Sequence, residues 1–139
     1  MDGKTFMIEV ATRLRCDERR AEGVTLAVFQ ELRDRLTPRE AADVAAQLSK
    51  PLKTLWGSLD RADRPVRRTE EAEFVGDVRH VAGLADEAEA RRAVKAVFGV
   101  LQKALGSLTG KEGEAWDIYS QLPKGLKNLW LAASENPEG

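Results

Sequence analysis

The sequence contains one cysteine and one histidine among its 139 residues, and it has no long apolar run. The single cysteine, Cys16, excludes an internal disulfide bond, which is consistent with a reducing compartment. The single histidine, His80, excludes a helical di-iron centre, because such a centre takes two Glu-x-x-His elements. No window approaches about 18 uninterrupted apolar residues, and the first residues, MDGKTFMIEV, lack the apolar core of a signal peptide. We therefore expect a cytoplasmic protein with no membrane segment, no metal and no cofactor.

An excess of charge of either sign is also absent. The chain has 22 basic and 23 acidic residues, and its formal net charge is -1 at pH 7. No overall field therefore steers it toward nucleic acid or an acidic membrane. A composition of 42% hydrophobic and 32% charged residues suits a soluble helical protein and argues against disorder. A mass of 15.4 kDa fits one compact domain, or two small halves that share a core.

Helical periodicity and helix-start signals are present along the chain. In KTFMIEVATRLR, the residues Phe6, Val10 and Leu14 are four positions apart, which places them on one face of a helix. The stretch TPRE at residues 37–40 is typical of a helix start, with a capping threonine, a proline and a glutamate in order. The stretch DEAE at residues 86–89 predicts another start. Since no strand pattern appears, we expect an all-α fold.

Two stretches of ten residues nearly repeat each other. QLSKPLKTLW at residues 47–56 and QLPKGLKNLW at residues 121–130 share seven of their ten letters. Phe74 follows Phe6 by 68 positions, two AVF triplets are 69 apart, and the repeated stretches are 74 apart. The offset between the two copies rises by five, from 69 to 74, within GSLTGKEG, which indicates a longer loop there in the second copy. The pattern predicts two tandem copies of a three-to-four-helix unit, packed as one pseudo-symmetric helical bundle. The predicted parts are a first repeat at 1–59, a linker at 60–69 and a second repeat at 70–139.

The most specific stretch is LTPREAADVAAQL at residues 36–48. Its counterpart, LTGKEGEAWDIYSQLP at residues 108–123, keeps the Glu, the Asp and the Gln-Leu pair, but has Trp116 at the position of Ala42. These stretches resemble the signature of the bacterial family catalogued as domain of unknown function 2267, whose members typically carry the unit in tandem. The resemblance implies an all-helical cytoplasmic protein of a bacterium. It supplies neither an activity nor catalytic residues.

Polar residues of the repeated stretches are the first candidates for a binding surface. Asp43 and Gln47 lie one helical turn apart, as do Asp117 and Gln121. Such a repeated pair suits a binding site presented twice. It equally suits a structural role, in which each amide bonds a backbone group of a neighbouring helix or loop. We favour the structural role.

The repeated tryptophans and lysines are the second set of candidates. Trp56 and Trp130 lie at the edge of an apolar helix face, where an indole ring either seals a core or anchors a partner. We favour sealing, with anchoring as the role if the rings prove to be exposed. Lys53 and Lys127 lie on the outer side and are expected to be solvated. A phosphate or nucleic-acid site built from these lysines is the less favoured alternative.

The remaining features are interpreted as having no function of their own. The run RADRPVRR at residues 61–68 has acidic neighbours and no interleaved aromatic residue, which favours a solvated or ion-paired linker over a nucleic-acid site. His80 falls opposite the apolar face of its helix and is expected to be exposed. Arginines near Cys16 would lower the pKa of its thiol, but no second cysteine or neighbouring histidine supports catalysis. Paired carboxylates such as Glu70 and Glu71 sit at helix starts, where the helix dipole explains them, so no pair is expected to serve as a general acid and base.

The leading hypothesis is a non-enzymatic helical interaction module that binds another protein or a second copy of this chain. One alternative is a carrier of a small apolar ligand or lipid between the two repeats. A second alternative is a weak binder of nucleic acid or phosphate through its Lys and Arg clusters. The candidate interaction residues are Trp56, Trp130, Lys53, Lys127, Gln47 and Gln121.

Overall fold

The computed structural model describes residues 1–58 and 70–135, and within these ranges the chain is entirely helical, with eight helices and no strand. The expected all-α fold is therefore confirmed. The predicted linker at 60–69 lies outside the described residues. The helices are α1 (Gly3–Leu14), α2 (Glu18–Arg33), α3 (Pro38–Gln47), α4 (Lys50–Gly57), α5 (Glu71–Ala82), α6 (Glu87–Ala104), α7 (Gly113–Gln121) and α8 (Lys124–Glu135). Among the helices of these two ranges, none has the length and apolar character needed to cross a membrane.

The helix starts follow from side chains that cap free backbone N–H groups. The Asp17 carboxylate accepts a hydrogen bond from the Arg20 N–H at 2.7 Å and begins α2. The hydroxyl of Thr37 accepts one from the N–H three residues later, and the Asp86 carboxylate does the same for α6. Each cap satisfies a donor that a helix leaves unpaired at its first turn. The starts predicted at residues 37–40 and 86–89 are confirmed.

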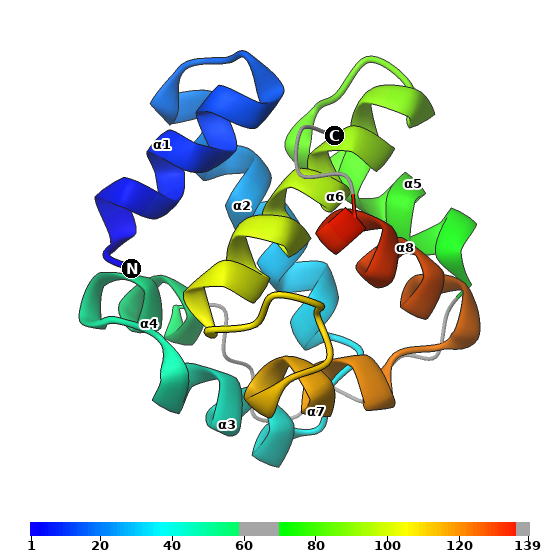
Figure 1. Cartoon of the computed structure of the whole chain (residues 1–139). Helices are drawn as coiled ribbons and strands as arrows, with labels where there is room; N and C mark the ends of the chain where they lie inside the picture. Colours follow the sequence, from blue (N-terminus) through cyan, green and yellow to red (C-terminus); the bar gives the residue numbers. More distant parts are fainter. Residues whose placement is uncertain (59–69, 136–139) are drawn as a thin grey trace.

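The two longest helices, α2 and α6, lie at the centre of the molecule (Figure 1). Helix α1 packs against both of them, α5 packs against both from the other half, and α8 packs against α6. The short helices α3 and α7 pack side by side at one end of the bundle, at the bottom of Figure 1. The two halves of the chain therefore share one core, in which the apolar side chains of every helix from α1 to α8 take part.

An aromatic cluster lies in the core of each half. The ring centroid of Phe29 is 5.8 Å from that of Phe6 and 5.1 Å from that of Trp56. In the second half, the rings of Phe74 and Trp130 lie 5.8 and 4.9 Å from the ring of Phe98. Such edge and tilted arrangements add to the free energy gained by burying the rings. These are the contacts that two copies of one unit would make, although the tandem origin itself stays a prediction.

Both indole rings of these clusters are fully buried. Trp56 donates a hydrogen bond from its Nε1 to the Ala41 carbonyl oxygen at 2.9 Å, and Trp130 donates to the Gly110 carbonyl oxygen at 2.6 Å. In return, the Trp130 carbonyl oxygen accepts a bond of 2.9 Å from Gln102 Nε2. The favoured interpretation, that the two indoles seal the core, agrees with this burial. Their alternative role as surface anchors does not hold in the folded chain, because a buried ring cannot contact a partner.

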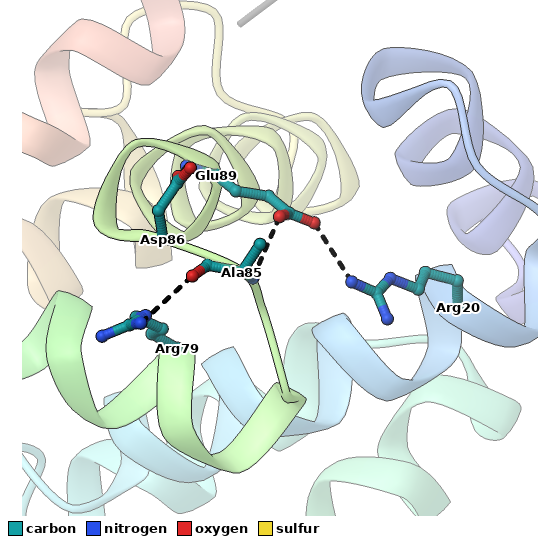
Figure 2. Close-up of polar contacts among 5 residues, drawn as sticks. All are labelled: Arg20, Arg79, Ala85, Asp86 and Glu89. Atoms are coloured by element: carbon teal, nitrogen blue, oxygen red, sulfur yellow. Dashed lines mark hydrogen bonds and ion pairs between the residues drawn. The ribbon is translucent and has the colours of Figure 1, made fainter.

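Polar contacts also join the two halves at the N-terminal ends of the central helices (Figure 2). Arg20 of α2 forms an ion pair of 3.1 Å with Glu89 of α6. The second oxygen of the same carboxylate accepts a hydrogen bond from the Ala85 N–H at 3.1 Å, and the Ala85 carbonyl accepts one from Arg79 of α5. A partly exposed ion pair adds little stability by itself. Because the Glu89 carboxylate also accepts the hydrogen bond from the turn before α6, it links that turn to α2 in the other half of the chain.

The close contact between Trp130 and Gly110, to which its indole donates a hydrogen bond, predicts that two alanine substitutions lower the stability by unequal amounts. Gly106 and Gly110 have φ angles of 77° and 78°. Gly106→Ala and Gly110→Ala therefore each place an alanine in the left-handed backbone conformation, at a cost of about 1 kcal/mol. A Cβ atom at Gly106 meets open space, whereas one at Gly110 lies 2.9 Å from Trp130 Nε1. We expect Gly110→Ala to lower the free energy of unfolding by about 1–3 kcal/mol more than Gly106→Ala. Urea denaturation measures both values, and equal losses would contradict the prediction.

Candidate functional site

Carboxylates of α3 and α7 gather where these two helices pack together. Glu40 and Asp43 come from α3 and Glu114 comes from α7, and one oxygen from each lies within 4.8 Å of the others. Asp117, one turn after Glu114, raises the pKa of Glu114 by its negative charge. We call these four residues the carboxylate cluster. Glu114 and Asp117 follow Glu40 and Asp43 by 74 positions, so the same two positions of the repeated signature meet each other.

Glu114 is the member whose ionisation is most disturbed. Its side chain is partly buried, and its Oε1 atom is hidden from solvent without a hydrogen-bond partner. Burial, followed by the negative charges of Asp117, Asp43 and Glu40, raises the pKa of Glu114 from its ordinary value of 4.5 to about 7. The Glu114 carboxyl group therefore gains or loses its proton near neutral pH.

The cluster has two chemical capabilities. It can share a proton among neighbouring carboxylates, as closely spaced acids do. Glu40, Asp43 and Glu114 could also each offer one oxygen to a hydrated divalent cation, since Mg²⁺ and Ca²⁺ prefer carboxylate and water ligands. Three carboxylates supply half of an octahedral shell, and exposed acidic groups of this kind are common without a bound ion. The raised pKa of Glu114 supports the first of these capabilities.

The expectation that no carboxylate pair serves as a general acid and base stays a prediction. The closeness of Glu114 to the carboxylates of α3 was missed, however, because each residue lies in a helical stretch with the pattern of an ordinary polar face. A signal was present in the repeated Glu and Asp, three positions apart in both halves. Their approach, however, depends on α3 packing against α7, which the sequence does not state. Of the predicted polar pairs, Asp43 and Asp117 enter the cluster, while Gln47 and Gln121 are exposed at the surface.

The α7 helix also carries an aromatic–lysine surface, formed by Lys111, Trp116, Tyr119 and Lys127. The Trp116 ring is 47% exposed, and its centroid lies 5.6 Å from that of Tyr119. The Lys111 ammonium lies 5.3 Å from the Tyr119 ring centroid and 5.9 Å from that of Trp116. The Lys127 ammonium, from α8, lies 5.4 Å from Tyr119. These distances are within the range of cation–π attraction, which holds both lysines against the rings.

The loop between α6 and α7 is held by a network of hydrogen bonds. The Glu112 carboxylate accepts bonds from the backbone N–H groups of Leu108 and Thr109 at 2.9 and 3.0 Å. These bonds lower the pKa of Glu112. The Gly110 N–H donates to the Ser107 hydroxyl at 2.8 Å, while the Gly110 carbonyl receives the Trp130 bond. The loop is therefore fixed, and it presents the side chain of Leu108, which is 86% exposed.

The other predicted candidates do not converge on one site. Lys53 is exposed on α4, whereas Lys127 is half-buried on α8 against Tyr119. Figure 1 shows α4 and α8 on opposite sides of the molecule, so Lys53 and Lys127 do not share one phosphate site. His80 is exposed, as expected. The arginines of the run 61–68 lie outside the described residues.

Cys16 lies beside a small cavity between the two halves. The cavity has a volume of about 70 Å³, and its walls include Cys16, Arg20, Val24 and Leu84. Burial, followed by the charge of Asp17, raises the pKa of the Cys16 thiol, while Arg20 acts in the opposite direction. Arg20 lowers this pKa as expected, but burial and Asp17 outweigh it, so the net shift is upward. A cavity of this size holds a few water molecules but not an acyl chain.

Comparison with known proteins adds one finding. Residues 3–129 match a family described as "Uncharacterized conserved protein (DUF2267)". The match therefore begins at the start of α1 and ends within α8. A comparison with curated proteins found no significant match.

The raised pKa of Cys16 predicts that its thiol reacts slowly with alkylating reagents. We expect alkylation by iodoacetamide at neutral pH to be slower in the folded chain than in the chain unfolded by urea, because only the thiolate reacts and the folded site disfavours it. Mass spectrometry of time points gives both rates. A folded-state rate equal to or above the unfolded one would show that the arginines dominate after all.

Proposed function

Because the chain belongs to the DUF2267 family of uncharacterised conserved proteins, we propose its function from its own surface: it is a non-enzymatic interaction module. The aromatic–lysine surface of α7 and α8 binds a segment of another protein. The occupant presents an apolar side chain flanked by carboxylates. We place this activity in the cytoplasm of a bacterium, in line with the resemblance seen in the sequence and with the free Cys16.

The observation that carries the proposal is the half-exposed Trp116, which has the Lys111 ammonium over its ring. Large exposed aromatic rings are unusual on the surface of a soluble chain and are enriched at binding hot spots. The ring of Trp116 offers apolar area, the ammonium group of Lys111 lies beside it, and that of Lys127 lies against the neighbouring ring of Tyr119. Negative groups on a partner would complement these charges, while an apolar side chain would cover the ring.

The surface is also organised before any partner arrives. Both lysines are held against Tyr119, and Glu112 fixes the loop that precedes α7. A binding surface that is already ordered loses less conformational entropy on association than a flexible one. The loop presents Leu108 to solvent as a further apolar contact. These features support recognition of a protein segment.

The alternatives have less support. A phosphate ligand would pair with the two lysines but would leave the apolar area of the Trp116 ring uncovered. The cavity of about 70 Å³ beside Cys16 is too small for an apolar carrier's ligand, and the larger hollows of about 510 and 340 Å³, beside Met7 and Gly23, are open to solvent.

Peptide selection tests the proposal directly. A random peptide library displayed on phage would be panned against the immobilised chain, against Trp116→Ala and against Val81→Ala. Val81 is the matched control because it is exposed to the same degree, 48%, but lies on α5. We expect enriched peptides to combine an apolar residue with Asp or Glu. Their affinity should fall on the order of 30-fold in Trp116→Ala and should be unchanged in Val81→Ala.

Two results would overturn this assignment. Peptides that bind Trp116→Ala as well as the unaltered chain would remove the surface from consideration. A concentration-dependent dimer in sedimentation, abolished by Trp116→Ala and kept in Val81→Ala, would make a second copy of the chain the occupant instead. Circular dichroism of both variants confirms that the helices are intact before either result is read.

A further inference from the structure

We propose that the contact between α3 and α7 is a pH-sensitive joint between the two halves of the chain. The joint is closed while Glu114 carries a proton and is loosened when all four carboxylates of the cluster are ionised. This inference concerns the folded chain alone and does not depend on the proposed partner.

The joint is geometrically weak apart from its polar groups. Helix α3 has ten residues and buries Ala41 and Val44, while α7 has nine and buries Ala115 and Ile118. The apolar area that holds each short helix in place is therefore small, and hydrophobic stabilisation scales with that area. A change of charge at this contact is therefore opposed by only a small hydrophobic free energy.

The charges with the largest effect on Glu114 are negative. Glu40 and Asp43 face it from α3, and Asp117 lies beside it on α7. Of the two lysines of α8, Lys127 lies against the ring of Tyr119 and Lys124 is exposed. Arg39, the cation of α3, is exposed. Deprotonated Glu114 would therefore add a negative charge to a group that already repels it, with one oxygen hidden from water.

The direction of the pH effect follows from these contacts. In the folded chain, burial and the three neighbouring carboxylates hold the pKa of Glu114 at about 7, above its ordinary value of 4.5. The folded state therefore binds this proton more tightly than the unfolded state. The resulting stabilisation is fully present below pH 4.5 and is lost as the pH rises through about 7. The folded chain should be more stable slightly below neutral pH than slightly above it.

Denaturation across pH tests the joint. Urea unfolding would be followed from about pH 5.5 to about pH 8.5 at constant ionic strength, with a chelator present so that no divalent cation replaces the proton. Three chains are compared: the unaltered one, Glu114→Gln, and Glu22→Gln as a control at an exposed carboxylate of α2. Glutamine imitates the protonated acid. We expect the folding equilibrium constant of the unaltered chain to fall by about 10-fold or more relative to Glu114→Gln over this range. Glu22→Gln should follow the unaltered chain.

A direct titration keeps the test decisive if Glu114→Gln folds poorly. The carbon-13 signal of the Glu114 carboxyl group, recorded by NMR in the folded chain, should move with a midpoint near 7. In Asp117→Asn, where one of the neighbouring charges is removed, that midpoint should shift to lower pH. A midpoint near 4.5 in the unaltered chain, or identical pH profiles for the unaltered chain and Glu114→Gln, would overturn the proposal.

Discussion

Two indole N–H groups buried away from water set the constraint on which the rest of this fold depends. A buried donor without an acceptor costs about 1–3 kcal/mol, so each indole must meet a carbonyl oxygen. Trp56 of α4 meets Ala41 of α3, and Trp130 of α8 meets Gly110 in the loop before α7. The first bond joins α4 to α3 in the first half, and the second joins α8 to the loop before α7 in the second half. The positions of α3 and α7 at one end of the bundle follow from these bonds.

The placement of α3 beside α7 has an electrostatic consequence. It brings together the carboxylates that both stretches carry at matching positions, Glu40 and Asp43 with Glu114 and Asp117. The buried aromatic clusters hold the helices together in the core, while repulsion among the carboxylates opposes the contact between α3 and α7. One proton on Glu114 relieves that opposition, which is why its pKa lies far above that of an ordinary glutamate.

The two halves differ most where the second half has its longer loop. In the first half Trp56 bonds to a helix residue, whereas in the second Trp130 bonds to the loop that leads into α7. That loop is stiffened by Glu112, and the helix after it has Trp116 where the first half has Ala42. The aromatic–lysine surface therefore has no counterpart in the first half. One helix, α7, carries an acidic edge toward α3 and an aromatic surface toward solvent.

Sequence patterns identified the local structure well. Capping residues at 37–40 and 86–89 marked helix starts, because such signals act within a few residues of the chain. Periodicity placed Trp56 and Trp130 at the edge of an apolar face and favoured their burial, which the structure shows. The surfaces were harder to predict. The replacement of Ala42 by Trp116 was visible in the sequence, yet its exposure depends on which side of α7 faces the core.

The sequence by itself determined that this chain is helical, where several of its helices begin, and which stretch recurs in its two halves. These properties rest on propensity, capping and periodicity, which are local. Tertiary structure alone decided that Cys16 has a raised pKa, that Lys127 is held against Tyr119, and that four carboxylates share one contact. Each of these depends on burial and on distances between helices far apart in the chain. Electrostatic energies follow those distances, and no spacing along the sequence contains them.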